Sequence, residues 1–335
     1  LTCVLTCMIF AAVSGSSVAT TFAIGAILIP ALIKHGYPTS YAAALQATSA
    51  ELGVIIPPSI PMILFGVSAE VSISQLFIAG VLPGILLAAL FSGYIMLWAL
   101  RHPEQVPAAD VRMSFMQKLS ESRSLIPVVL LIAAVLGSIY TGFATATEAA
   151  AVGVVGSLVL STVQGSMTWG TFKDSLMGAT RLYCMIALIL AGAAFLTLAM
   201  GYIGLPRHLA EWIASLGLNQ AQLIVALAVF YIILGCFLDG ISMVVLTMGV
   251  LMPTVQAAGS DPIWFGIFIV LVVEMAQITP PVGFNLFVLQ GMTGRQLPWI
   301  AKVAMPMFLL MCGAVALIYV FPGIVTWLPQ QMSAR

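Results

Sequence analysis

The chain has 335 residues, of which 61% are hydrophobic and 7% are charged, and its formal net charge is zero. With a mean hydropathy of +1.14, this composition excludes a water-soluble globular domain, in which about 25% of residues are charged. The neutral balance argues against a nucleic-acid partner, and the five cysteines lie in apolar runs, as small core side chains do. Long apolar runs between short polar ones predict an all-α polytopic protein in a lipid bilayer.

The first apolar stretch contains a small polar break at residues 14–17. The runs on either side, 1–13 and 18–32, are short for a membrane span, which needs about 20 residues. We therefore expect a re-entrant hairpin that enters and leaves by one face of the membrane. Irregular backbone of this kind is tolerated only where it lines a cavity or is buried in protein.

The next elements are predicted to be mostly full crossings. They are an interrupted helix at 41–67, broken at Pro57-Pro58, a crossing at 77–100, a polar connector at 101–124, and crossings at 125–140, 144–163 and 175–201. The connector is the longest polar stretch, and we expect an amphipathic helix on the membrane surface within it. Trp212 in the run 205–216 indicates a second interfacial helix.

The last third of the chain repeats the first at an offset of 223 residues. The second hairpin has arms at 220–237 and 243–255 on either side of a small polar break at 238–242, the second interrupted helix lies at 262–289, and a final crossing lies at 300–321. The matched pairs are Pro30 with Pro253, Gly36 with Gly259, Glu51 with Glu274, Pro57 with Pro280, Pro58 with Pro281 and Pro83 with Pro306. These ungapped matches predict an internal repeat; the alternative is that Pro and Gly only punctuate helices.

Counting the crossings places the polar loops on two sides. One side holds the loops at 34–39, 101–124, 164–174 and 290–298. Its basic residues are Lys34, Arg101, Arg112, Lys118, Arg123, Lys173 and Arg295, whereas only Arg207 and Arg335 lie on the other side. By the positive-inside rule the basic side is cytoplasmic and the C-terminus periplasmic. The equivalent loops at 34–35 and 260–261 then lie on opposite sides, as an inverted repeat requires.

The helix breaks supply the groups that an ion carrier needs. A helix interior offers no free carbonyl groups, but a break frees them for sodium, and the new helix N-termini offer N–H groups to an anion. The candidate sodium ligands are Ser14, Gly15, Ser16, Ser17, Gly53, Pro57, Ser59, Gly240, Ser242, Gln277, Thr279, Pro280 and Gly283. The alternative is a set of kinks whose hydroxyl groups bond back to their own helices.

Polar side chains near the breaks are candidates for substrate binding or gating. Asp239, at the predicted second tip, either holds a cation, gates the hairpin or caps the following helix. Asn285 and Gln277 suit substrate or ion contact, or hydrogen bonds between helices. Ser16 lies at the first tip, and Arg181 either snorkels to the cytoplasm or meets an anionic substrate.

Three acids lie inside the predicted membrane region: Glu51, Glu148 and Glu274. They either take part in proton coupling or pair structurally with a base. The histidines fall in expected loops, where we expect them to be solvated: His35, His102 and His208. The sequence contains no metal-ligand cluster, nucleophile–base pattern or phosphate loop, so we expect neither an enzyme nor a cofactor, with sodium as the coupling ion.

Four stretches carry a family resemblance: SGSSVAT at 14–20, GVIIPPSIPM at 53–62, YTGFATATEA at 140–149 and TPPVG at 279–283. Through them the sequence resembles the large membrane subunit, the dicarboxylate-type M subunit (DctM), of tripartite ATP-independent periplasmic (TRAP) transporters. The resemblance runs along almost the whole chain. Its most specific parts are the glycine-serine tip and the two Pro-Pro blocks.

The resemblance implies sodium-driven import of a small organic acid across the bacterial inner membrane. A periplasmic substrate-binding (P) protein delivers the acid, and a small four-helix membrane (Q) subunit accompanies the M subunit. It also implies an ion-transporter-type fold in which hairpin tips and broken helices hold sodium and a transport domain moves as an elevator. We assign residues 1–75 and 204–298 to that domain, and 76–203 and 299–335 to a scaffold.

Family M subunits are longer at the N-terminus, and the helix at 175–201 has no repeat partner in this chain. We therefore expect the first scaffold helices to be missing. One rival is a stand-alone anion symporter, coupled to sodium or protons, of the divalent-anion type, whose Ser-Asn-Thr tips are absent here. The other is a membrane scaffold, which has no need of four symmetric helix breaks, or an intramembrane enzyme, which would need a convergent nucleophile and base that are not visible in the sequence.

Overall fold

The computed structural model describes residues 2–107, 117, 122–215, 217, 219–257, 259–281 and 283–333, and these residues form helices and turns without a strand. Most of the predicted connector, including Arg112 and Lys118, and the C-terminal Arg335 lie outside this range. The chain divides into two compact units. The first unit comprises Leu1–Pro107 with Ala191–Arg335, and the second comprises Ala108–Leu190.

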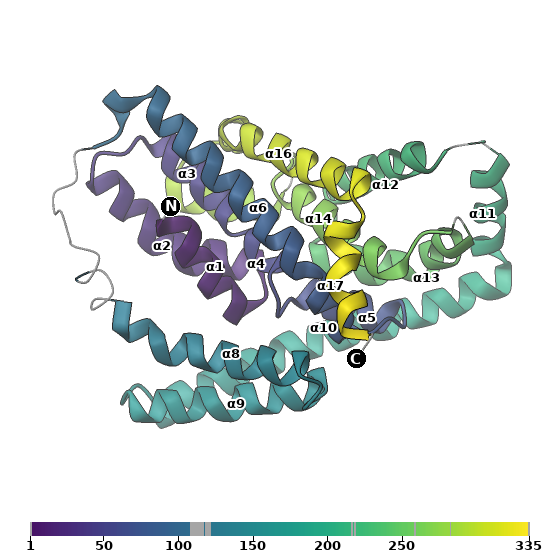
Figure 1. The fold of residues 1–335 in the computed structure, drawn as a ribbon, viewed down its shortest axis with the longest axis horizontal. Helices are drawn as coiled ribbons and strands as arrows, with labels where there is room; N and C mark the ends of the chain where they lie inside the picture. The colour runs from purple at the N-terminus through teal and green to yellow at the C-terminus, as the bar shows by residue number, and fades with distance from the viewer. Residues whose placement is uncertain are drawn as a thin grey trace. The chain divides into compact units, whose positions relative to one another are not determined.

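The first unit begins with two apolar helices that pack against each other, α1 (Thr2–Ser14) and α2 (Ser17–Lys34) (Figure 1). The interrupted helix follows as α3 (Thr39–Ser49), α4 (Leu52–Ile55) and α5 (Ile60–Ser68), with a 43° bend at the Pro57-Pro58 interruption. A turn that the sequence did not predict separates α3 from α4 and contains Glu51. The long helix α6 (Ile73–Arg101) completes this half, followed by a short 3₁₀ turn, η1 (Pro103–Gln105).

The other half of the first unit has the same order of elements. It contains the end of α10 (Trp169–Ile203), α11 (Leu205–Ser215), α12 (Gln220–Leu234), α13 (Gly240–Ala257), α14 (Pro262–Gln277), α15 (Phe284–Thr293), α16 (Leu297–Val320) and α17 (Gly323–Ser333). Shifted by 223, the bounds of α2 become those of α13. Both Pro-Pro pairs are joined by cis peptide bonds, and Gly36 and Gly259 both have a positive φ. The helix bounds therefore follow the offset found in the sequence.

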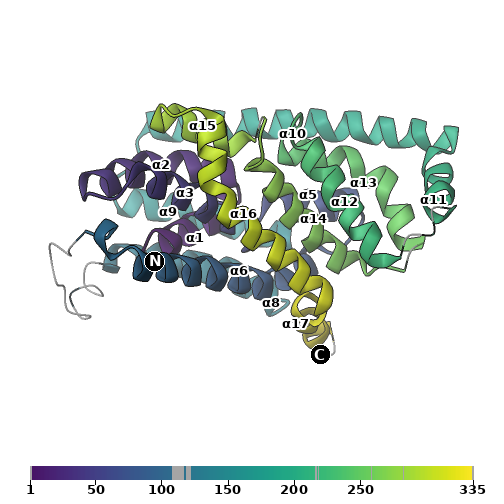
Figure 2. The same ribbon diagram turned by 90° about the horizontal axis from the view of Figure 1, so that it is seen from above.

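The core of the first unit is built around α14. Every residue from Trp264 to Gln277 is buried, and the helix contacts α12, α13, α16, α6 and α5. In Figure 2, α12 and α13 lie beside α14. A helix that is apolar on all sides and buried on all sides is the centre of a bundle, so α14 positions the groups at both of its ends.

The second unit contains η2 (Ser122–Leu125), α8 (Ile126–Tyr140), α9 (Ala146–Val163) and the first part of α10. The helices α8 and α9 pack side by side (Figure 1). Most side chains of α9 are apolar and face outward. Such faces suit contact with lipid or with another membrane protein.

Five helices of the described chain are long and apolar enough to cross a membrane: α2, α6, α9, α10 and α16. The bent helix α3–α5 makes a sixth if it is counted as one span. Because α2 meets this length, length by itself does not distinguish a re-entrant arm from a crossing, and the hairpin stays a prediction. The helix α17 was missed by the sequence analysis, because Pro322 precedes it and Pro329 lies within it.

Candidate ion and substrate site

The first tip, residues 14–17, is joined directly to the first break, residues 56–59. Gly15 has a φ of 63°, and its carbonyl oxygen accepts a hydrogen bond from the Ile60 backbone N–H at 3.1 Å. A Cβ at Gly15 would lie only 3.1 Å from the Pro58 carbonyl oxygen. Glycine is therefore needed both for the left-handed backbone and for the close approach. The structure thus brings together two groups of candidate ligands that are 42 residues apart in sequence.

Two helix N-termini begin at this junction, and each is capped by a serine. The Ser16 hydroxyl oxygen accepts a hydrogen bond from Ala19 N–H at 3.4 Å and caps α2. The Ser59 hydroxyl oxygen accepts one from Met62 N–H at 3.3 Å and caps α5. Ser14 Oγ lies 2.9 Å from Thr20 Oγ1. Positive ends of helix dipoles and serine oxygen atoms therefore lie at one place.

Gly53, a candidate sodium ligand from the sequence, also lies at a close contact between two helices. It lies on α4 against α1, where a Cβ would be 1.7 Å from the Cβ of Ala11. Only glycine fits at position 53, because two helix backbones approach each other closely at this point. We interpret Gly53 as the residue that lets α4 pack on α1 and so brings the first break to the first tip.

The second tip, residues 235–242, lies beside the second break, residues 278–283. Cys236 Sγ lies 3.6 Å from the Pro280 carbonyl oxygen. A Cβ at Gly240 would lie 3.5 Å from Gln277 Nε2. Thr279 donates a hydrogen bond to Met275 O on its own helix at 2.7 Å, which is the back-bonded arrangement considered above. Val282 is outside the described residues.

Asp239 caps α13 with both of its carboxylate oxygens. Oδ2 accepts hydrogen bonds from Ile241 N–H at 3.1 Å and Ser242 N–H at 3.3 Å, and Oδ1 accepts one from the Ser242 hydroxyl group. The capping role considered from sequence is therefore present. The helix α13 begins at Gly240, so the predicted break at 238–242 is partly the first turn of this helix.

The two repeat-equivalent acids, Glu51 and Glu274, form a buried cluster. Asn285 Nδ2 donates a hydrogen bond to Glu51 Oε1 at 2.5 Å. The Glu274 carboxyl group is close enough to Glu51 and Ser17 to interact electrostatically with both. All four side chains are at most 4% exposed. Of the two alternatives that the sequence left open for these acids, pairing with a base is not seen among the described residues, where their neighbours are an amide, a hydroxyl group and each other.

The cluster retains polar atoms that have no protein partner. These are Glu51 Oε2, Glu274 Oε2 and Asn285 Oδ1. The side-chain nitrogen and oxygen of Gln277 also lack a hydrogen-bond partner. Buried polar atoms without a partner cost free energy, and they concentrate here between the two tips. Both acids were singled out from the sequence, but their contact with each other was not predicted. The feature that could have indicated this contact is their equivalence in the repeat.

The remaining candidates lie elsewhere. Glu148 accepts a hydrogen bond from the Thr145 backbone N–H at 2.8 Å and forms a capping box at the start of α9. Arg181 is exposed on the part of α10 that belongs to the second unit. His35 and His208 are exposed, as expected, whereas His102 is half-buried and stacks on Trp98 with ring centroids 5.2 Å apart.

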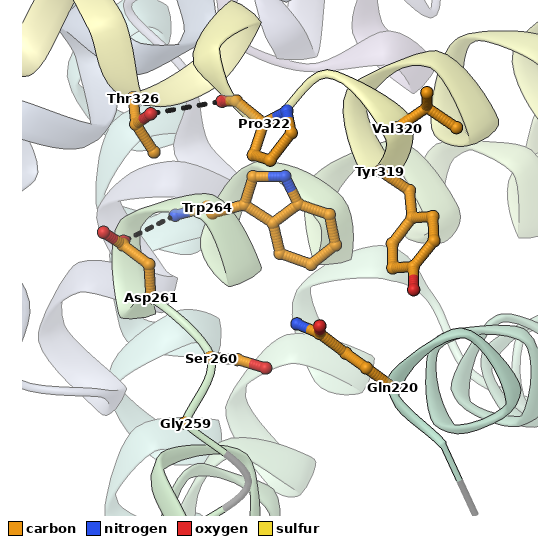
Figure 3. A pocket seen from close by; sticks show the side chains of 9 residues that line it. All are labelled: Gln220, Gly259, Ser260, Asp261, Trp264, Tyr319, Val320, Pro322 and Thr326. Atoms are coloured by element: carbon orange, nitrogen blue, oxygen red, sulfur yellow. Dashed lines mark hydrogen bonds between the residues drawn. The ribbon is translucent and has the colours of Figure 1, made fainter.

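An open pocket of about 390 Å³ lies at the other end of α14, away from the second break (Figure 3). It is lined by Gln220, Gly259, Ser260, Asp261, Trp264, Tyr319, Val320, Pro322 and Thr326. Asp261 Oδ1 accepts hydrogen bonds from Ile263 N–H and Trp264 N–H and so caps α14. None of these residues was a candidate from sequence, and the helix breaks do not contribute to the pocket.

The fold and these helix breaks define a polytopic membrane transport protein. The sequence matches the family described as "Tripartite ATP-independent periplasmic transporter, DctM component" over residues 1–324. The chain belongs to this family, which consists of transporter subunits and not of enzymes.

Individual relatives cover nearly all of this chain. The C4-dicarboxylate TRAP transporter large permease protein DctM of Pseudomonas aeruginosa is 32% identical over 98% of this chain and 77% of its own length. The ectoine/5-hydroxyectoine large permease protein UehC of Ruegeria pomeroyi is 35% identical over 96% of this chain and 75% of its own length. The isethionate permease protein DctMQ of Oleidesulfovibrio alaskensis is 32% identical over 95% of this chain, which spans 50% of that protein.

Proposed function

We propose that this chain is the transport subunit of a TRAP transporter that imports a small organic acid across the bacterial inner membrane, driven by a sodium gradient. The observation that supports this most is the pairing of tips with breaks. In each half of the repeat a tip lies against the break of the same half, and at the first tip the contact is the Ile60–Gly15 backbone hydrogen bond. Two such junctions place carbonyl groups outside regular helix, together with helix N-termini, in one molecule.

We propose that the two junctions each hold sodium. Their ligands are the candidates predicted from sequence at residues 14–17, 53, 57–59, 240–242 and 277–283, and Gly53 also lets α4 pack on α1. Ser16, Asp239 and Arg181 remain the candidates for substrate contact or gating, whereas Asn285 Nδ2 is hydrogen-bonded to Glu51. In this proposal Asp239 gates by holding the start of α13.

The substrate class is inferred from chemistry and from relatives. Helix N-termini favour an anion, and the relatives are named for C4-dicarboxylates, isethionate and ectoine, all of which carry an acid group. We propose a carboxylate substrate delivered by a periplasmic binding protein. The name DctMQ of one relative supports a small Q subunit as the membrane partner.

The mechanism proposed is an elevator, with residues 1–75 and 204–298 moving against 76–203 and 299–335. The two repeats are inverted in the membrane, so that each hairpin opens to a different side. The loops at 34–39, 101–124, 164–174 and 290–298 are then cytoplasmic.

Uptake by reconstituted vesicles tests this proposal. The full-length protein would be reconstituted with its small subunit and binding protein, and labelled organic acids followed with and without an inward sodium gradient. We expect uptake that needs both sodium and the binding protein and that falls at least about tenfold in Ser16→Ala. Ser157→Ala is the matched control, because Ser157 on α9 donates only to Val154 O of its own helix.

Two outcomes would contradict the proposal. Uptake without the binding protein would favour the stand-alone symporter. Uptake that ignores the sodium gradient would exclude sodium as the coupling ion.

A further inference from the structure

The buried cluster of Ser17, Glu51, Glu274 and Asn285 joins segments that belong to the two proposed ion sites. Each member is close in sequence to one of them. Ser17 belongs to the first tip, and Asn285 follows Gly283 of the second break by two positions. Glu51 precedes the first break on the same interrupted helix, and Glu274 precedes Gln277 by one helical turn.

Every polar contact of the cluster crosses from one half of the repeat to the other. Glu51, in the first half, accepts a hydrogen bond from Asn285 in the second half. Glu274, in the second half, is close enough to interact with Ser17 and Glu51, both in the first half. The cluster is therefore a contact between halves and not part of the packing within either one.

The symmetry of the repeat explains where the cluster lies. Glu51 and Glu274 occupy equivalent positions, and equivalent residues of two related halves can touch each other only at the symmetry axis between them. The partners break the symmetry, because the equivalent of Ser17 is Gly240 and the equivalent of Asn285 is Met62. Besides the other acid, each acid thus has one polar neighbour, and in both cases that neighbour comes from the opposite half.

Such a chain of contacting side chains can make sodium binding at one junction affect sodium binding at the other. Sodium at the first tip restrains the start of α2 and with it Ser17, whereas sodium at the second break restrains the start of α15 and with it Asn285. Both restraints act on one pair of acids in a buried environment, where hydrogen bonds are strong and loss of a partner is costly. Ordering of one tip then lowers the cost of ordering the other, which is positive coupling.

We propose that Glu51, Glu274 and Asn285 are positioning residues that couple the two sodium sites across the symmetry axis. This rests on the proposed function, because it requires sodium at both junctions. The residues act through hydrogen bonds, so a side chain of the same shape with the same hydrogen-bonding pattern preserves the coupling. They do not contact the transported acid.

The test is the sodium dependence of uptake in the full-length protein with its partners. Asn285→Leu and Glu51→Met remove the Asn285–Glu51 hydrogen bond with little change of volume. Glu51→Gln keeps an oxygen to accept from Asn285 and gains an amide that can donate to Glu274. Gln46→Met is the matched control: Gln46 is equally buried, on α3, and its contacts with Cys7 and Thr20 lie within the first half.

We expect the wild-type protein to respond steeply to sodium, with a Hill coefficient above 1. Asn285→Leu and Glu51→Met bring the coefficient toward 1 and raise the sodium concentration for half-maximal uptake at least about fivefold, the lower end of typical coupling. The KM for the organic acid at saturating sodium stays unchanged. Glu51→Gln and Gln46→Met keep the wild-type steepness.

Several results would overturn the inference. One is a wild-type Hill coefficient of 1, and another is a loss of maximal rate in both apolar variants without a change in steepness. Loss of steepness in Glu51→Gln would assign the role to charge and not to hydrogen bonding. A raised KM in Asn285→Leu alone would make Asn285 a substrate ligand. If Glu51→Met does not fold, Asn285→Leu carries the test; wild-type uptake without sodium dependence would instead refute the proposed function.

Discussion

At the scale of single residues, Gly15 and Gly36 allow the effect of a positive φ to be separated from the effect of a close contact at the Cβ position. Both have a positive φ, 63° and 86°. At Gly15 a Cβ would meet the Pro58 carbonyl oxygen at 3.1 Å, whereas at Gly36 the nearest atom is a Pro107 side-chain carbon at 3.5 Å. Gly36 thus needs glycine for its positive φ only, because no atom lies closer than ordinary contact distance to its Cβ position.

We expect Gly15→Ala and Gly36→Ala to lower the free energy of unfolding by a similar amount, about 1–2 kcal/mol, because both force alanine into the left-handed region. Only Gly15→Ala should also abolish uptake, because its methyl group displaces the first break from the first tip. Thermal unfolding in detergent and sodium-driven uptake measure the two effects. Equal loss of uptake in both variants would contradict the junction at Gly15.

At Asp239, substitution can separate helix capping from a need for the negative charge. Its oxygens are occupied by the first turn of α13, and asparagine caps helices about as well as aspartate does. We expect Asp239→Asn to retain stability and uptake, and Asp239→Ala to lose about 1 kcal/mol together with most uptake. A stable Asp239→Asn protein that does not transport would show that the negative charge itself is needed.

At the scale of elements, α17 shows how a short helix is held by its neighbours. It contacts α6 and α14, and Val325 on its inner face is completely buried, whereas Val320 at the end of α16 is 62% exposed. The helix contains a proline and is only 11 residues long, so its own propensity is weak. Packing on α6 and α14 therefore stabilises it.

The two valines provide a matched comparison of this packing. We expect Val325→Ala to lower the free energy of unfolding by about 1–3 kcal/mol, because it leaves a cavity between α17 and its neighbours. Val320→Ala makes the same chemical change at an exposed position and should have an effect below about 0.5 kcal/mol. Denaturation of the purified protein would measure both, and equal effects would argue against docking of α17.

At the scale of the whole molecule, the repeat makes a prediction about orientation. The last turn of α2 contains Ile33 and the last turn of α13 contains Gln256, and these exposed residues are equivalent at the offset of 223. In an inverted repeat, equivalent residues near the ends of the hairpins lie on opposite sides of the membrane. A parallel repeat would place them on the same side.

Labelling of single cysteines distinguishes the two arrangements. In a background without the five native cysteines, we expect Gln256→Cys in spheroplasts to react with a membrane-impermeant maleimide. Ile33→Cys should react only after the membrane is opened, because its loop carries Lys34 on the cytoplasmic side. Reaction of both cysteines from the outside would contradict the inverted repeat.

Much of the architecture could be predicted from the sequence because it depends on local properties of the chain. Apolar runs of helical length, Pro-Pro pairs and small polar breaks determine where helices begin and end, and the bounds of α2, α8 and α9 agree with the predicted runs within about two residues. The capping side chains Ser16, Ser59 and Asp239 also lie at the predicted breaks. The helix α17 and the turn before α4 were not predicted, because proline and tertiary contacts outweigh the local sequence pattern at these two places.

The sequence by itself determined the helices, the breaks, the repeat and the family of this protein. Only the tertiary structure decided which groups meet: the first tip with the first break, Gly53 with Ala11, and Glu51 with Asn285, which are 234 residues apart. The physical reason is that a helix break is encoded by a few neighbouring residues, whereas a contact across a bundle depends on how every intervening helix packs. The equivalence of Glu51 and Glu274 was visible in the sequence, but their contact at the symmetry axis followed only from the packing of the two halves.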